Sequence, residues 1–246
     1  MTHYSRRVPL LWLCTILWLG LILPGCQSSR KGVDYSFDPP RTIAVAPFLN
    51  QSGSEFLDTM AVTDEFYTEL QQVKGLHVVP VNQVLATLGK QGHMQVSSPA
   101  EAVALLEALH ADGVIVGSIT QYDPYFPPKV GMAVQLYYRE TTPATELNSK
   151  FINPGELARH DKPFTGMAPG EPIRPRAAVV RIYDADQTEV VEKIKRYAKQ
   201  RSGSERPAGW RNYITTRNYL RFVSYEIIGE MLAQERERLV AQARGE

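Results

Sequence analysis

Residues 42–48 read Thr-Ile-Ala-Val-Ala-Pro-Phe, a short apolar run between two segments of turn-forming residues. A run of this length is typical of a buried strand. Residues 50–54, Asn-Gln-Ser-Gly-Ser, end the strand, and the residues after them predict an amphipathic helix. Its apolar stripe, which Thr63 interrupts, consists of Phe56, Met60, Tyr67 and Leu70. A buried strand followed by such a helix is typical of the start of an α/β domain.

Capping residues indicate where two of the helices begin. Ser52 and Glu55 have the spacing of a capping box, in which a hydroxyl and a carboxylate satisfy free backbone N–H groups. Ser98 is followed by Pro99 at the first helical position and Glu101 at the third, which is a stronger start signal. The sequence therefore predicts helices that begin just after Ser52 and just after Ser98.

The remaining elements extend this pattern over one domain. Further apolar runs predict strands at residues 76–80, 114–119, 130–139 and 177–183. Helical patterns cover residues 81–88, 99–109, 184–197 and 211–242. Helices between the early strands predict parallel pairing there, and the short turn at 122–129 predicts an antiparallel hairpin. We therefore expect an α/β fold: a single three-layer domain with a mixed five-stranded sheet flanked by helices.

Residues 141–176 interrupt the pattern with six prolines and three glycines, so no helical or strand period survives there. A loop of this length inside a compact domain is usually functional or disordered. We interpret it as a proline-rich insert within a domain that spans residues 42–246.

The chain starts with the features of a secretory signal peptide. Arg6 and Arg7 precede an uncharged apolar run, residues 8–23, which is shorter than the ~20 residues of a membrane-spanning helix. Removal of residues 1–25 would leave Cys26 first, and the polar residues 26–41 are typical of a flexible tether. An ordinary signal peptide followed by a chance cysteine is the alternative interpretation.

Leu23-Pro24-Gly25-Cys26 resembles the lipobox of bacterial lipoproteins. The resemblance implies cleavage between Gly25 and Cys26, and lipidation of Cys26 with fatty acids such as palmitate. Each buried CH₂ of an acyl chain contributes ~0.8 kcal/mol to membrane binding. Gln27 follows the cysteine in place of Asp, which in that family implies sorting to the outer membrane.

Composition excludes some classes of function. Without residues 1–25 the chain has 25 basic and 26 acidic residues, so nothing predicts a nucleic-acid partner. Hydrophobic residues make up 43% of the chain, enough to build a core. The two cysteines are Cys14, in the signal peptide, and Cys26, so the domain itself has neither a disulfide nor a thiolate metal site.

No motif of an enzyme occurs in the sequence. It lacks a nucleophile elbow, a phosphate-binding loop, a zinc-protease helix and a dinucleotide fingerprint. None of its five histidines has metal-ligand spacing to another, and Asp184 and Asp186 suit a helix start better than a cation. We therefore predict a protein without enzymatic activity, catalytic residues, metal or cofactor.

Two segments are candidates for binding a partner. The turn at residues 122–129 holds three prolines, and its candidate contact residues are Tyr122, Tyr125, Phe126 and Lys129. The alternative is a rigid turn that packs on its own domain. The second segment, residues 193–221, carries nine basic residues and one acidic residue. Its candidate contact residues are Lys195, Arg196, Lys199, Trp210 and Arg211.

The aromatic residues of the second segment suggest two kinds of ligand. Tyr197, Trp210, Tyr213 and Tyr219 would be able to stack on sugars or lie at a lipid interface. A plain solvated helix face is the alternative, because basic residues near a helix end also suit its dipole. The insert at 141–176 is a third candidate, without named residues.

The strand at 42–48 and the motif Asn50-Gln51-Ser52-Gly53 resemble the opening of the CsgG-like and TolB amino-terminal-like envelope domains. Residues 111–119, Ala-Asp-Gly-Val-Ile-Val-Gly-Ser-Ile, resemble a later strand of that family. The likeness covers residues 42–139. It implies an exported scaffold that works through protein contacts, often as a ring, as in the family members CsgG, PelC and LpoB. It implies no catalytic residues.

The family's pore-forming members insert two hairpins per subunit into the membrane. A membrane-spanning strand needs ~9–11 alternating residues, which neither the insert nor the turn at 122–129 supplies. We therefore expect a lipoprotein that is anchored in the outer membrane and faces the periplasm. It would assist envelope assembly or export by binding envelope proteins and by forming a homo-oligomer. The alternatives are a glycan-binding or glycan-processing envelope enzyme and a membrane-surface sensor.

Overall fold

The computed structural model describes residues 36–139, 174–202 and 209–244. The predictions about the signal peptide, Cys26, most of the tether and most of the insert fall outside these ranges. In chain order the described elements are β1 (Ser36–Val45), β2 (Leu49–Asn50), α2 (Thr59–Leu70), β3 (Lys74–Val78), α3 (Val81–Lys90), α4 (Pro99–Ala108), β4 (Gly113–Asp123), β5 (Lys129–Tyr138), β6 (Ala177–Asp184), α6 (Thr188–Ser202), the 3₁₀ helix η2 (Gly209–Ile214) and α7 (Thr216–Arg244).

The strands form one mixed sheet in the order β3-β1-β4-β5-β6, and the short β2 pairs with β4. Strand β1 is parallel to β3 and β4, whereas β5 is antiparallel to β4 and β6. The predicted fold class, mixed pairing and hairpin are confirmed. Strand β2 makes the sheet six-stranded, and the sequence did not predict it because two residues show no periodicity.

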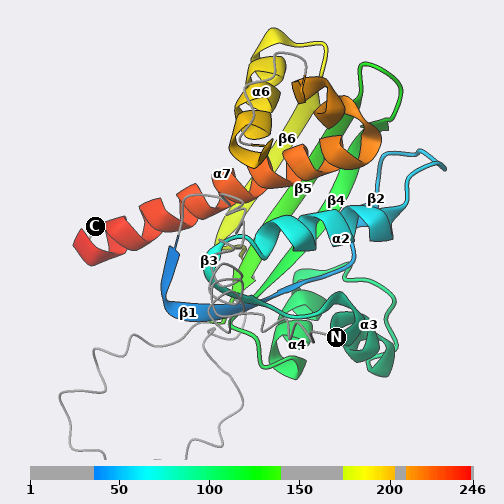
Figure 1. Cartoon of the computed structure of the whole chain (residues 1–246). Coiled ribbons are helices and arrows are strands. Elements are labelled where there is room, and N and C mark those ends of the chain that lie inside the picture. Colours follow the sequence, from blue (N-terminus) through cyan, green and yellow to red (C-terminus); the bar gives the residue numbers. More distant parts are fainter. Residues whose placement is uncertain (1–35, 140–173, 203–208, 245–246) are drawn as a thin grey trace, which may run out of the picture. The chain divides into compact units, whose positions relative to one another are not determined.

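Strand β1 lies inside the sheet, and its alternate side chains enter two separate cores. Ile43 and Val45 belong to the larger core with residues of α2, α6 and α7, while Ala44 and Ala46 belong to a smaller core with α3 and α4. All four side chains are completely buried. Figure 1 shows α2 and α7 side by side across the sheet, and α3 and α4 pack against the C-terminal end of β1.

Phe48 closes the larger core just after β1. Its ring lies 5.1 Å from the ring of Phe66 in α2, and it covers Gly117 of β4, where a Cβ would lie only 2.3 Å from the ring. The N–H of Phe48 donates to Oγ1 of Thr63 at 3.0 Å, and this hydroxyl donates to the carbonyl of Thr59 at 2.7 Å. Thr63, the polar residue in the predicted stripe, therefore provides the hydrogen-bond acceptor for the buried N–H of Phe48.

The predicted capping box at Ser52 is wrong. Helix α2 begins at Thr59, and its cap is Asp58, whose carboxylate accepts the N–H groups of Met60 and Ala61 at 3.0 Å each. The hydroxyl of Ser52 instead donates to Oδ1 of Asn50 at 2.8 Å within a turn. Phe56 consequently lies ahead of the helix, outside the buried stripe, and is 78% exposed.

The other helix predictions agree more closely with the structure. The Ser98 hydroxyl accepts the N–H of Glu101 at 3.2 Å, which confirms the start of α4. Helix α6 begins at Thr188, so Asp184 and Asp186 precede it, and the Asp184 carboxylate accepts the Asp186 N–H at 3.0 Å. Part of the predicted last helix is η2, and the buried residues of α7 include Leu220, Val223, Ile227, Met231 and Leu232.

Strand β6 forms one edge of the sheet, and a side chain of α7 occupies part of that edge. The side-chain amide of Gln234 accepts the N–H of Ala178 and donates to its carbonyl, each at 3.1 Å. Arg181 also donates to Glu230 of α7. These contacts attach the second half of α7 to β6.

Within the described ranges, no helix is both long enough and apolar enough to cross a lipid bilayer.

The Thr63 hydrogen bond predicts a specific stability effect. Replacing Thr63 with Val keeps the shape of the side chain but leaves the buried N–H of Phe48 without an acceptor. Such a loss should lower the free energy of unfolding by about 1–3 kcal/mol. Urea denaturation measures it.

The matched control is Thr68→Val in the same helix, where the hydroxyl only donates to the carbonyl of Asp64. This change should alter stability by less than about 0.5 kcal/mol. Equal effects of the two substitutions would contradict the role of Thr63.

Candidate interaction surface

The tip of the β4–β5 hairpin is fixed at its base. Lys129 forms an ion pair with Asp184 at the end of β6, with 2.6 Å between Nζ and Oδ2. The N–H of Ala185 donates to the carbonyl of Pro128 at 3.0 Å, and the N–H of Tyr125 donates to the Asp123 carboxylate at 3.0 Å. These contacts hold the tip in one geometry relative to the sheet.

The four predicted contact residues of this turn have two different roles. Tyr125 and Phe126 are 73% and 83% exposed and make the outer surface of the tip. Tyr122 is half-buried and packs against the larger core, where burial raises the pKa of its phenol. The hydrogen bond to Asp184 raises the pKa of Lys129, and the same bond lowers the pKa of Asp184. Tyr122 and Lys129 therefore support the tip, and Tyr125 and Phe126 are available to a partner.

A second loop lies at the same end of the sheet. Strand β2 pairs with β4 at Ser118 and Ile119, and the N–H of Gln51 donates to the Ile119 carbonyl at 2.9 Å. The loop that follows, residues 51–58, therefore starts beside the strand that leads to the hairpin tip, as Figure 1 shows. It carries the exposed Phe56, which the helical pattern had assigned to the buried face of a helix.

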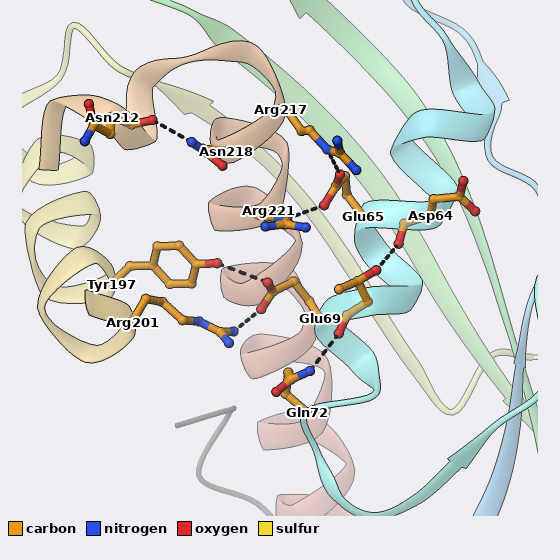
Figure 2. Close-up of polar contacts among 11 residues, drawn as sticks. Asp64, Glu65, Glu69, Gln72, Tyr197, Arg201, Asn212, Arg217, Asn218 and Arg221 are labelled. Atoms are coloured by element: carbon orange, nitrogen blue, oxygen red, sulfur yellow. Dashed lines mark hydrogen bonds and ion pairs between the residues drawn. The ribbon is translucent and has the colours of Figure 1, made fainter. Parts of the chain in front are cut away.

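Three arginines of the basic segment form ion pairs with two buried carboxylates of α2. Arg217 and Arg221 both donate to Glu65, and Arg201 donates to Glu69 (Figure 2). Glu65 and Glu69 are only 3% and 5% exposed. The sequence pattern missed these pairs because the partners are 132–156 residues apart in the chain.

The Glu69 carboxylate has a pKa above its ordinary value. Burial raises its pKa, and Arg201 and the Tyr197 hydroxyl oppose that rise. Tyr197 donates to Oε1 of Glu69 at 3.1 Å, and its ring is 5.1 Å from the guanidinium carbon of Arg201. Because a buried carboxylate needs a partner, this cluster attaches α6 and α7 to α2.

The rest of the basic segment lies on α6 and η2. Lys195 forms an exposed pair with Glu192 at 2.7 Å, and its Nζ is 5.6 Å from the centroid of the Trp210 ring. The guanidinium carbon of Arg211 lies 5.4 Å from the same ring. Trp210 is half-buried against the larger core. Arg196 and Lys199 are exposed on α6. These five residues form a basic surface that remains a predicted partner site.

Two of the four aromatic residues of this segment are buried and offer no face for sugar stacking. Tyr197 and Tyr219 are 2% and 1% exposed, and the ring of Tyr213 meets that of Tyr197 edge-on at 5.3 Å. Two cations flank Trp210. The hypothesis that this row of aromatics stacks on a glycan is therefore wrong for Tyr197 and Tyr219.

No group of three or more His, Cys, Asp or Glu side chains with the geometry of a metal site occurs in the described part of the chain. Asp184, one of the carboxylates considered for a cation, is paired with Lys129 instead.

Comparisons with known proteins give only distant likenesses. No protein-family model and no curated protein sequence matches the chain. Among solved structures, the LpoB C-terminal domain from Salmonella enterica is 14% identical, covering 44% of this chain and 76% of that one, with a TM-score of 0.35. Lipoprotein GNA1162 from Neisseria meningitidis is 16% identical, with coverage of 59% and 81% and a TM-score of 0.34.

The PelC dodecamer from Paraburkholderia phytofirmans is also similar in part. It is 14% identical, covers 41% of this chain and 61% of that one, and has a TM-score of 0.26. Overlaps at these TM-scores are partial, so the CsgG-like resemblance of residues 42–139 stays a prediction. The function proposed below rests on the residues of this chain.

The buried ion pairs predict an asymmetry between two arginines. Arg201→Met leaves the Glu69 carboxylate buried without its cation and should lower the free energy of unfolding by about 3–5 kcal/mol at neutral pH. Without Arg201, the pKa of Glu69 in the folded state lies further above its value in the unfolded state. As the pH falls, Glu69 therefore binds a proton in the folded state before it does so in the unfolded state. The loss in the free energy of unfolding that Arg201→Met causes should therefore become smaller as the pH falls from about 7 to about 5.

Arg217→Met is the matched control. The Arg217 side chain is 78% exposed, and Glu65 keeps Arg221 when Arg217 is removed. The loss should be below about 1 kcal/mol. Urea denaturation at the two pH values measures both variants, and a pH-independent loss in Arg201→Met would contradict the assignment.

Proposed function

We propose that this protein is a non-enzymatic lipoprotein of the bacterial envelope that assists assembly or export by docking envelope proteins. The observation that carries the proposal is the hairpin tip, where two large aromatic side chains, Tyr125 and Phe126, are exposed on a firmly held turn. Aromatic residues in fixed positions contribute much of the binding energy of protein interfaces, because little conformational freedom is lost on binding.

The topology of the sheet supports an anchored role. Strand β1 runs parallel to β4, and β4 leads to the tip, so the chain enters the domain at the opposite end of the sheet. Ser36, where β1 begins, is ten residues after Cys26. A lipid on Cys26 would hold the domain at the outer membrane, facing the periplasm, while the tip binds a partner.

The anchor is tested by Cys26→Ala. Loss of the acyl chains removes ~0.8 kcal/mol of membrane affinity per CH₂, so the mature protein should leave the membrane fraction and stop incorporating labelled palmitate. Cys14→Ala, which changes the other cysteine, should behave as the wild type. Retention of the Cys26→Ala protein in the membrane fraction would show that the anchor is elsewhere.

The docking role is tested by a photoreactive residue in place of Phe126. Irradiation of living cells should yield a covalent adduct with an envelope protein, because this side chain is 83% exposed at the tip. The control position is Met94, which is 85% exposed but lies between α3 and α4. The proposal fails if position 126 gives no protein adduct or gives the same products as position 94.

A further inference from the structure

Phe56 has the features of a contact residue, although it lies outside the hairpin. It is 78% exposed in the loop between β2 and α2. Among the described residues, the exposed aromatic side chains are Phe56, Tyr125 and Phe126. All three therefore belong to two loops at one end of the sheet, while the opposite end has none.

The two loops follow paired strands, since β2 pairs with β4 at Ser118 and Ile119. Leu57, next to Phe56, and Tyr122, at the base of the tip, both pack against the larger core. The Asp58 carboxylate is close enough to the Tyr122 phenol to add to the rise of its pKa that burial causes. Phe56 thus lies at the same end of the sheet as Tyr125 and Phe126.

The loop that carries Phe56 is held by its own hydrogen bonds. The Asn50 side chain donates to the Ser54 carbonyl at 2.8 Å and accepts the Ser52 N–H at 3.0 Å. The N–H of Ser54 donates to the Ser52 hydroxyl at 3.2 Å, and Gly53 has a φ of 74°, which favours glycine. An ordered loop presents its aromatic side chain without a large entropy cost on binding.

The charges around these aromatics are mainly acidic. Within residues 51–58 and 123–129, Glu55, Asp58 and Asp123 are exposed carboxylates. The single cation there, Lys129, is paired with Asp184. A partner that binds this end of the domain would need an apolar centre surrounded by positive charge.

We propose that Phe56, Tyr125 and Phe126 form one two-loop surface that docks into an apolar pocket bordered by Lys or Arg on an envelope protein. The proposal rests on the proposed function and adds the second loop and the charge of the partner. An anionic lipid surface would meet repulsion from the three carboxylates. A second copy of the same surface would bring two acidic borders together.

The decisive experiment places the photoreactive residue at position 56 in the full-length protein in living cells. Position 56 should give an adduct with the same protein that position 126 captures, and the crosslinked partner peptides should lie next to basic residues. Position 94 should not capture this protein. An adduct of position 56 with a phospholipid, or with a differently tagged second copy, would overturn the proposal.

Two substitutions test the contribution of the second loop, with the adduct at position 126 as the readout. Phe56→Ser should lower its yield about tenfold, as expected for loss of an aromatic hot spot. Glu55→Lys should lower the yield by a similar factor, and Glu55→Gln by less. Glu107→Lys, an exposed glutamate on α4, should have no effect.

The two proposals fail in different ways. If position 126 keeps its adduct while position 56 captures nothing and Glu55→Lys changes nothing, the two-loop surface is wrong and the docking role stands. If neither position captures a protein, both proposals are wrong.

Discussion

The double burial of β1 is the constraint on which the rest of the fold depends. The strand is paired on both edges, and its side chains alternate between two cores, so helices must cover both faces of the sheet at this point. The small side chains of Ala44 and Ala46 face α3 and α4, whereas Ile43 and Val45 face the larger core. Strand β4, the parallel neighbour of β1, then leads away from this centre to the hairpin tip.

Beside the larger core, buried charged side chains lie between α2 and the helices α6 and α7. Glu65 and Glu69 of α2 lie against arginines of α6 and α7, so the carboxylates are removed from water but remain neutralised (Figure 2). Removing one charged partner of such a pair is costly, while the intact pair adds little net stability. The pairs therefore determine which faces of the three helices meet. Hydrophobic contacts alone would determine these faces less strictly.

Local patterns predicted the elements but not the contacts between distant ones. The Ser98 cap and the β4–β5 hairpin follow from a few neighbouring residues, and the structure contains both. The strand predicted at 42–48 is present as Ser36–Val45, so it begins within residues predicted to be tether. The basic segment was open to several interpretations because nothing in its own residues reveals Glu65 and Glu69. Phe56 was misplaced because Ser52 and Glu55 imitate a capping box, while the Asn50 turn uses the same serine for another bond. The ion pair of Lys129 with Asp184, at the base of the tip, joins two residues that only the folded sheet brings together.

The Gln234 amide at the edge of β6 also bears on how copies of this chain would assemble. An open sheet edge invites the strand of a neighbouring molecule, and proteins commonly protect such edges. At Ala178 the amide already occupies both backbone groups, so an incoming strand would first have to displace it. A ring or filament of this protein would therefore not be built by pairing the sheets of neighbouring molecules edge to edge through this part of β6.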